Sequence, residues 1–489
     1  MTLRLDIDTR KKLLEHISRL RVDADPQAGD LDLARVFLPL PRHALALRPD
    51  VVVLAGSRGA GKTALFNLIT LLGRRVPDFF NDQAIPAAYW VAAFAESPEH
   101  PQPAVLDQVV ARINSSSDDP LRTFWAVHLL ARLADASVPG ATMPPPLAAA
   151  VRAAPGDPGA WLDKAQVHLA AVIAALDVVD RTLEKSSTYL FASYDHLDRL
   201  GALTATRNAR QRLVRSLLAL WLSLSSRYRR LRAKIFLRPD LLEEAERAFP
   251  DASKLRARSV SLEWDVSALY MLAVRHLANQ GPDIEVMVDW IREKARLDLE
   301  RHSASSKFGL LPPTMGEDEQ WTFATALAGE QMGSGPKKGY TYRWIPQRLK
   351  DGSGSIVPRS LLRLLGVAAK QSLRYPRGRG PLISTEDLVG ALVETSRARV
   401  TELGDEYPVV KRLENLSSQT MLMERDDVIA LLANRTAADD PFGTDGELIF
   451  QELHRIGVLE TRADGRVDVP DIYRYGYNIK RKGGARAPR

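Results

Sequence analysis

The sequence predicts an α/β fold in which a parallel sheet is followed by regions that are mainly helical. Three observations support this prediction: short apolar runs alternate with helical stretches up to about residue 264, a glycine-rich loop follows the first run, and helical periodicity dominates beyond Trp264. Strands that alternate with helices favour parallel pairing, because each helix returns the chain to the same end of the sheet. A chain of 489 residues has room for about two to four domains.

The composition is that of a folded globular protein, with 45% hydrophobic and 26% charged residues. The absence of cysteine excludes disulfides, thiolate zinc sites, iron–sulfur clusters and cysteine nucleophiles. Residues Met1 to Asp6 contain no apolar signal segment and the apolar runs are too short to span a bilayer, so we expect a cytoplasmic protein without a membrane partner. A net charge of +7 permits a nucleic-acid partner without requiring one.

Four apolar runs predict the strands of the sheet. The first, Val51–Ala55, is rich in β-branched residues and does not alternate with polar residues, as expected of a strand buried on both faces. The glycine-rich loop and a helix at 64–72 follow it. The other runs are Ala88–Phe94, Tyr189–Tyr194 and Lys234–Leu237, with a long helical stretch at about 205–232 before the last one.

Changes in composition divide the chain into four regions. We expect a helical lead-in at 1–48, a core at 49–264, a helical lid at 265–375 and a helical C-terminal domain at 376–489. The proline-rich segment Val138–Pro146 cannot continue a helix, so we expect an insertion at about 138–158 within the core. The lid prediction depends on helical periodicity at 267–278, 286–296 and 358–370.

The last part of the chain carries a hairpin signal. The runs Val458–Arg462 and Arg466–Val469 flank the turn Ala463-Asp464-Gly465, and an Asp-Gly pair between two such runs is typical of a tight β-hairpin. A helical stretch directly precedes the hairpin. A helix followed by a hairpin has the order of a recognition helix and its wing, so we expect a winged-helix-like C-terminal module.

The glycine-rich loop fits the phosphate-binding pattern G-x-x-x-x-G-K-[ST] completely, and it stands between a predicted strand and a predicted helix. The glycines let backbone N–H groups converge on phosphates, Lys62 neutralises the β- and γ-phosphate oxygens, and Thr63 offers its hydroxyl to Mg²⁺ at the positive end of the helix. The fold class is therefore a parallel-sheet P-loop NTPase core with a helical lid and a C-terminal helical, winged-helix-like domain. The expected nucleotide contacts are Gly56, Ser57, Arg58, Gly59, Ala60, Gly61, Lys62, Thr63 and Ala64.

We predict ATP and Mg²⁺ as the ligands of this loop. The Asn-Lys-x-Asp pattern that reads guanine in many GTPases is absent, which favours ATP without excluding GTP. A magnesium site usually includes a carboxylate at the end of a neighbouring strand, and Asp195 follows the run Tyr189–Tyr194. A helix N-cap is the alternative role for Asp195.

Hydrolysis also needs a group that orients or deprotonates the attacking water. Asp198 is the candidate for this role, against the alternative of a solvated surface acid. The position directly after Asp195 is where fast ATPases carry an acid, and here it is His196. Slow hydrolysis, typical of a switch, is therefore the expectation.

Several arginines are candidates for contact with the γ-phosphate. Arg238 follows the run Lys234–Leu237 at the carboxyl edge, where ligands bind in open α/β sheets, and the alternative is a surface arginine before a proline. Arg256 or Arg258 could enter the site of a neighbouring subunit, although a solvated charge is the simpler interpretation for each.

The C-terminal segment at 444–489 is the candidate for a nucleic-acid contact. The tail Lys480–Arg486 is basic, and we expect it to be flexible. It follows Tyr473, Tyr475 and Tyr477, and such a combination can grip phosphates and stack on bases. A protein interface explains the same residues equally well. A homo-oligomer or a partner protein is therefore also expected.

The order of these parts resembles the AAA+ and STAND superclass of ATPases, with Gly56–Thr63 as Walker A, Asp195 and Asp198 as Walker B, and Arg238 near the sensor-1 position. The segment Val357-Pro358-Arg359-Ser360-Leu361-Leu362 is similar to the start of the sensor-2 helix of origin-recognition-type ATPases. By that resemblance Arg359 is a nucleotide contact. The segments Tyr194-Asp195-His196-Leu197-Asp198 and Val469 to Gly484 look like poorly characterised bacterial P-loop ATPases, some found near genome-defence genes.

These observations lead to one main hypothesis and two alternatives. The main hypothesis is a slowly hydrolysing ATPase that acts as a nucleotide-dependent conformational switch in a multi-protein assembly, with antiviral defence as the setting implied by the resemblance. The first alternative is a DNA-binding, initiator- or loader-like ATPase that uses its winged helix and basic tail. The second, a small-molecule kinase, leaves the C-terminal third of the chain unexplained.

Overall fold

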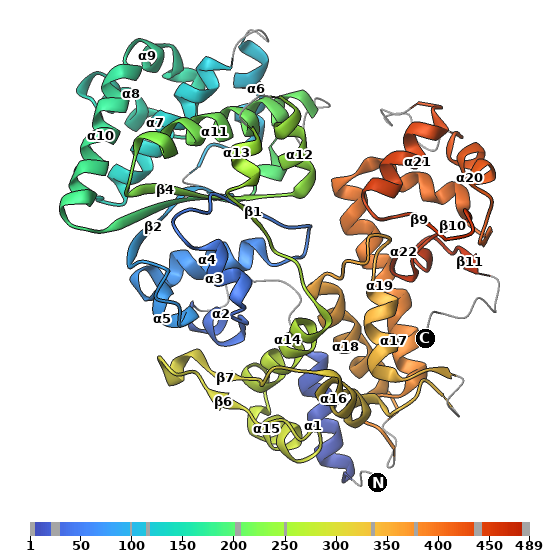
Figure 1. Cartoon of the computed structure of the whole chain (residues 1–489). Helices are drawn as coiled ribbons and strands as arrows, with labels where there is room; N and C mark the ends of the chain where they lie inside the picture. The colour runs from blue at the N-terminus through green and yellow to red at the C-terminus, as the bar shows by residue number, and fades with distance from the viewer. Residues whose placement is uncertain are drawn as a thin grey trace. The chain divides into compact units, whose positions relative to one another are not determined.

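The computed structural model describes residues 5–20, 30–97, 100–113, 118–200, 207–248, 252–333, 338–375, 380–434 and 443–481 (Figure 1). The chain forms two compact units. The core unit is Pro39–Leu262, and the second unit combines Met1–Leu38 with Glu263–Arg489. The segment expected as a lead-in is therefore shared: residues up to 38 belong to the second unit and the following ones to the core.

The core unit is built on a parallel sheet of five strands in the order β2-β3-β4-β1-β5. Helices cover both faces of the sheet, with α4 and α5 on one side and α7, α10, α11 and α12 on the other (Figure 1). Strands that are covered on both faces have continuous apolar sequences, as these strands largely do. The parallel sheet with helices on both faces confirms the predicted α/β class. The strands are β1 Val53–Ala55, β2 Ala88–Phe94, β3 Tyr189–Tyr194, β4 Leu231–Leu237 and β5 Ser259–Ser261.

The strand bounds differ from the expected runs in two places. β1 begins at Val53 rather than at residue 51, because the chain before it is held by the turn in which Val51 N–H donates to the Arg48 carbonyl. β4 begins at Leu231 rather than at residue 234, because the helical stretch that was expected to reach residue 232 ends at Arg227. β2 and β3 have the expected bounds.

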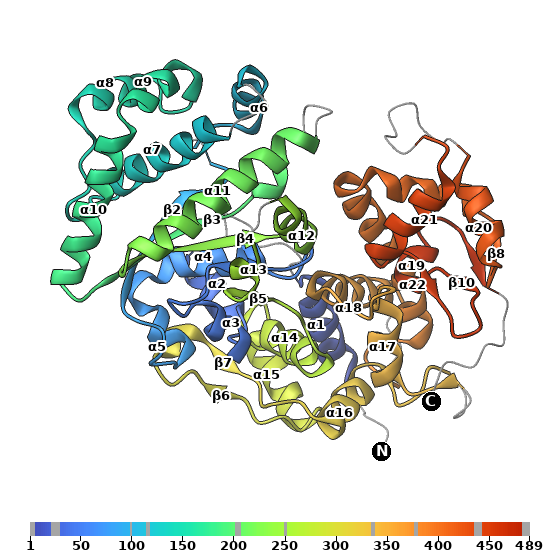
Figure 2. The same ribbon diagram turned by 45° about the horizontal axis from the view of Figure 1, so that its top comes forward.

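The core helices that connect the strands include a large helical insertion between β2 and β3. Figure 2 shows α8 and α9 farther from the sheet than α7 and α11. The proline-rich segment does not only interrupt helices, because α8 begins at Pro145, where a proline loses no intrahelical hydrogen bond. The bounds are α3 Pro41–Ala46, α4 Lys62–Leu72, α5 Val76–Phe80, α6 Pro103–Arg112, α7 Asp119–Asp135, α8 Pro145–Ala153, α9 Leu162–Val167, α10 Leu169–Lys185, α11 Arg207–Arg227, α12 Pro239–Ala248 and α13 Ala252–Arg256.

The second unit is mainly helical, as expected for the lid and the C-terminal domain. Asp265 caps α14 through the Ala268 N–H, and Ser384 caps α19 through the Asp387 N–H, which explains why these helices begin where they do. Its helices up to residue 406 are α1 Ile7–Ser18, α2 Asp30–Val36, α14 Val266–Asn279, α15 Ile284–Glu293, α16 Glu317–Ala328, α17 Thr341–Leu349, α18 Pro358–Ser372 and α19 Thr385–Glu406. A short antiparallel hairpin joins β6 Glu300–Arg301 to β7 Leu310–Leu311.

A buried arginine joins the N-terminal segment to the lid. The Arg275 side chain on α14 is 0% exposed, and its guanidinium donates to the carbonyls of Ala34 and Phe37, which precede the core unit. It also donates to the carbonyls of Phe308 and Leu310. Because one side chain satisfies backbone groups from residues 34–37 and 308–310, the segment before the core unit belongs with the second unit rather than with a separate lead-in.

The C-terminal part contains the expected helix and hairpin. The helix α21 (Gly446–Arg455) is followed by β9 (Glu460–Thr461) and β10 (Val467–Asp468), which pair antiparallel. The helix α20 (Arg425–Leu432) packs beside α21. This arrangement confirms a helical, winged-helix-like C-terminal domain.

The basic tail is partly structured, which corrects the expectation of a flexible segment. Lys480 and Arg481 form β11, which pairs parallel with β8 (Thr420–Met421), and the Arg481 guanidinium lies 2.8 Å from the Asp468 carboxylate. Tyr473 is 1% exposed, so it cannot stack on bases as expected. Residues 482–489 lie outside the described residues. None of the described helices combines the length and the apolar character needed to cross a bilayer.

Candidate nucleotide-binding site

The glycine-rich loop stands at the carboxyl end of β1, which lies between β4 and β5 in the sheet. Its first residue is tied to the sheet, because Gly56 N–H donates to the Leu237 carbonyl at 3.0 Å. Gly59 and Gly61 have φ values of 85° and 95°, a left-handed conformation that glycine adopts without strain. The helix α4 begins at Lys62, so the positive end of a helix of three turns faces the loop.

A side chain at Gly56 would be crowded by its neighbours. A Cβ at this position would lie 3.2 Å from the Ala60 Cβ and 3.4 Å from both the Leu262 Cβ and the Lys62 Cγ. The loop therefore closes tightly on itself and on Leu262, the last residue of the core unit.

The Lys62 ammonium lies inside the loop. Its Nζ donates to the Gly56 carbonyl at 2.6 Å and to the Ser57 carbonyl at 3.2 Å. A lysine held in this position places a cation where the backbone amides of the loop converge. This is the arrangement required to neutralise a phosphate chain.

Asp195 is buried at the same edge of the sheet. Its side chain belongs to a residue that is 2% exposed, and its backbone N–H donates to the Phe94 carbonyl at 2.9 Å. One carboxylate oxygen, Oδ2, is buried without a hydrogen-bond donor, and His196 Nδ1 lies 3.7 Å from it. A buried carboxylate oxygen without a donor is costly unless a cation is bound to it.

These residues fit Mg²⁺. One carboxylate oxygen from Asp195 and the hydroxyl of Thr63 in the first turn of α4 are oxygen ligands, and Mg²⁺ typically takes one or two protein ligands while phosphates and waters supply the rest. In the described part of the chain, no group of three His, Asp or Glu side chains could hold a metal without such additional ligands. The N-cap alternative for Asp195 does not hold, because His196 occupies the N-cap of the short helix that follows.

Arg238 stands between the loop and Asp195. Arg238 follows β4, which lies between β1 and β3 in the sheet. Ala55 pairs with Leu237, so the residues that follow them, Gly56 and Arg238, are adjacent at the ends of neighbouring strands. Arg238 is 2% exposed, which excludes the surface alternative. Its guanidinium forms two hydrogen bonds to the Asp240 carboxylate, at 3.0 and 2.5 Å, so a phosphate contact has to share or replace this ion pair.

The remaining predicted residues lie on other elements of the two units. Asp198 lies in the short 3-10 helix Leu197–Arg199 beyond the sheet edge. Arg256 lies 3.3 Å from the Glu246 carboxylate. The Arg258 carbonyl accepts from Val52 and Val53 N–H groups and so joins the start of β1 to the edge strand. Arg359 belongs to the second unit, where it lies 3.7 Å from the Glu402 carboxylate.

Sequence reasoning missed the role of Lys234, which lies inside β4 and holds the chain that enters β1. Its Nζ donates to the carbonyls of Ala46, Arg48 and Val51 at 2.9, 2.5 and 2.6 Å. Burial lowers the pKa of Lys234 well below its ordinary value, while the three carbonyls match the three N–H donors of its charged form. This lysine fixes the chain that enters β1 and therefore supports the strand that carries the loop.

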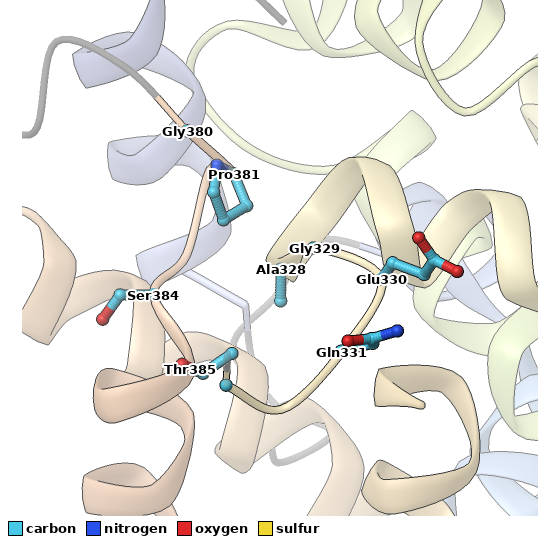
Figure 3. A pocket seen from close by; sticks show the side chains of 9 residues that line it. Ala328, Gly329, Glu330, Gln331, Gly380, Pro381, Ser384 and Thr385 are labelled. Carbon is cyan, nitrogen blue, oxygen red and sulfur yellow. The ribbon is translucent and has the colours of Figure 1, made fainter. Parts of the chain in front are cut away.

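A cavity of about 490 Å³ in the second unit does not compete with this site (Figure 3). It lies between the end of α16 at Gly329 and the start of α19 at Thr385. The Ser384 hydroxyl beside it already caps α19 and donates to Asp387. The Ser384 side chain is therefore already engaged within the helix that it caps.

The sheet, the loop and the buried carboxylate define a protein with a P-loop NTPase core, helical additional domains and a winged-helix-like C-terminal module. No protein-family model matches the sequence, and no curated protein matches it. Among solved structures, the chain is similar to the ORC2 protein of Aeropyrum pernix in its ADPNP–ADP complexes, at 13% identity over 92% of this chain and 93% of that chain with a TM-score of 0.40. It is similar to Cdc6p of Pyrobaculum aerophilum at 11% identity over 96% and 95% of the two chains, with a TM-score of 0.30. At these identities and scores, neither likeness carries an argument about activity.

Proposed function

We propose that the protein is an AAA+-like ATPase that binds ATP with Mg²⁺ and hydrolyses it slowly, as a nucleotide-dependent switch within a larger assembly. The observation that carries the proposal is the pairing of the complete loop Gly56–Thr63 with the buried Asp195 Oδ2, which lacks a donor. A cation-binding carboxylate beside a phosphate-binding loop serves nucleotide chemistry specifically.

Each residue of the core site has a role in this proposal. The loop amides and Lys62 bind and orient the β- and γ-phosphates, and Thr63 and Asp195 hold Mg²⁺. The bound Mg²⁺ supplies positive charge that offsets the charge developing on the phosphate oxygens. Arg238 contacts the γ-phosphate, with Asp240 holding its guanidinium at the strand end.

The switch part of the proposal rests on how the loop is connected to the end of the core unit. The chain leaves the core unit after Leu262, and Leu262 N–H donates at 2.7 Å to the carbonyl of Ala55, the residue before the loop. Leu262 also restricts the space at Gly56. A movement of the loop on nucleotide binding therefore also displaces Leu262, the residue that leads into the second unit.

ATP hydrolysis by the full chain tests the proposal, with the mass in solution recorded in the same samples. Lys62→Ala removes the cation from the loop, so we expect it to lower the hydrolysis rate by about 100-fold or more and to abolish ATP-dependent changes in mass. Lys185→Ala, at the exposed end of α10, is the matched control and should behave as wild type. Hydrolysis that persists unchanged in Lys62→Ala would show that the activity comes from elsewhere.

A DNA-binding, loader-like ATPase is the second candidate, favoured by the helix α21 and the hairpin β9–β10. The described residues 443–481 contain seven acidic and six basic residues, so this module by itself has no excess of positive charge. The basic residues Lys482, Arg486 and Arg489 follow it. A DNA contact therefore depends on residues beyond 481.

Removing residues 482–489 separates the two candidates. If DNA is bound, the full chain should show affinity that falls steeply between about 50 and 200 mM salt, and the truncated chain should lose most of that affinity and any stimulation of hydrolysis. Equal hydrolysis with and without duplex DNA, in both chains, would favour the protein-partnered switch. The truncation leaves β11 intact, because that strand ends at Arg481.

A further inference from the structure

The nucleotide-binding site lacks an acidic residue directly after Asp195. His196 occupies that position, and Asp198 lies beyond the sheet edge in the short helix Leu197–Arg199. An attacking water needs a carboxylate close to the strand end that holds Asp195. The neighbouring strand β2 supplies one.

The pairing of β2 with β3 brings Glu96 level with His196. The two strands are parallel, and Phe94 pairs with Tyr194 after the register slips by one residue beyond Ala92. Glu96 stands two positions beyond Phe94, as His196 stands two positions beyond Tyr194. Because the strands end at the same edge, Glu96 reaches the edge where Asp195 lies.

A direct contact joins the two residues. Glu96 N–H donates to His196 Nδ1 at 3.4 Å. His196 has a φ of 59°, a left-handed conformation that turns the chain sharply after Asp195. The ring of His196 accepts at Nδ1, and it therefore holds the Glu96 backbone beside Asp195 without engaging the Glu96 side chain through this bond.

The segment that carries Glu96 is also anchored on its far side. His100 is 3% exposed, its ring centroid lies 5.5 Å from that of Phe94, and its Nδ1 lies 3.1 Å from Nε2 of the buried His128. Between these anchors Glu96 itself is exposed. A backbone held by His196, with an exposed carboxylate at the edge of the site, is the arrangement that a water-orienting residue requires.

We propose that Glu96 is the catalytic carboxylate that orients and deprotonates the attacking water, in place of the acid that is absent at position 196. In this step the water oxygen forms a bond to the γ-phosphorus while a proton of the water passes to the Glu96 carboxylate. The bond between the γ-phosphorus and its bridging oxygen breaks, and ADP leaves with the electron pair. Glu96 then returns the proton to solvent. This inference rests on the proposed ATPase function.

The test compares Glu96→Gln with Asp198→Asn in the full chain. Glu96→Gln keeps the backbone N–H that donates to His196 and nearly the same side-chain volume. We expect kcat to fall by about 100-fold or more in Glu96→Gln, with KM for ATP within about twofold of wild type and with intact ATP retained on the protein after rapid separation. Asp198→Asn should lose less than about fivefold in kcat. Glu394→Gln, an exposed glutamate on α19, is the control.

The outcomes distinguish this inference from the proposed function. Hydrolysis in wild type that depends on Lys62, together with an unchanged kcat in Glu96→Gln, would overturn the role of Glu96 and leave the ATPase intact. A large fall in Asp198→Asn alone would assign the role to Asp198 and equally overturn the inference. Absence of Lys62-dependent hydrolysis in wild type would remove the proposed hydrolysis and the inference with it. A parallel rise in KM in Glu96→Gln would indicate a loss of binding and also contradict a catalytic role.

Discussion

Asp195→Asn should abolish Mg²⁺-dependent ATP hydrolysis while leaving the nucleotide-free protein at least as stable as wild type. Asp195 Oδ2 is buried without a donor, so the negative charge is costly to the fold in the absence of a cation. The isosteric amide removes that charge and also removes the oxygen ligand. We expect kcat to fall by about 1,000-fold and the free energy of unfolding without Mg²⁺ to stay unchanged or rise by about 1 kcal/mol.

The measurement pairs hydrolysis at increasing Mg²⁺ with thermal unfolding in the presence of a chelator. Wild type should gain stability when ATP and Mg²⁺ are added, because a ligand that binds only the folded state stabilises it, and Asp195→Asn should lose most of this gain. Asp163→Asn, in the exposed first turn of α9, is the control and should match wild type in both assays. A variant at Asp195 that is destabilised but still active would show that the carboxylate is structural.

Arg275→Met should destabilise the second unit strongly without changing the core site. The arginine side chain is 0% exposed, and its replacement leaves the carbonyls of Ala34, Phe37, Phe308 and Leu310 without their donor. Burial lowers the pKa of Arg275 to about 9, so the guanidinium is still charged at neutral pH and donates to all four groups. Unsatisfied buried carbonyls cost about 1–3 kcal/mol each, and we expect a loss of about 4 kcal/mol or more.

Calorimetry of the full chain measures this effect. A loss of this size lowers the melting temperature of a unit of this length by about 10 °C. Arg301→Met, at an exposed position in β6, removes a guanidinium of the same kind and should shift the transition by less than about 2 °C. If Arg275→Met also melts within about 2 °C of wild type, the four contacts do not hold the N-terminal segment as the structure indicates.

The bounds of β2 and β3 were predictable because both strands are parallel and covered on both faces. Such strands read as apolar runs that end where the strand ends, and both runs ended at the observed residues, Phe94 and Tyr194. β4 was placed less accurately because its first residues, up to Arg232, were assigned to the preceding helical stretch, which ends at Arg227. The next charged residue of the strand, Lys234, is nevertheless buried. Its ammonium is satisfied by three backbone carbonyls from residues 46–51, and no local pattern shows such a contact.

The proline-rich segment and the tail show a similar limit. The proline-rich segment was interpreted as an interruption of helical structure, and it does separate α7 from α8, but its neighbours in the chain did not show that Pro145 begins α8, where its missing N–H costs nothing. The basic residues Lys480 and Arg481 were interpreted as a flexible tail, but β8 supplies a strand partner for them from about 60 residues earlier in the chain. In both cases the residue type limited the possible local structure. The structural element that the residue joins could not be deduced from its neighbours in the sequence.

The sequence by itself determined the phosphate-binding loop, the strand that carries it and the carboxylate at the end of β3, because each depends on residues that are adjacent in the chain. Only the tertiary structure decided that Glu96 stands beside His196, that Arg238 is paired with Asp240 inside the protein, and that the segment up to Leu38 belongs with the second unit. The first and last of these depend on contacts between residues about 100 to 240 positions apart. These contacts result from the pairing of strands and from the burial of Arg275. Neither can be predicted from residues that are close together in the sequence.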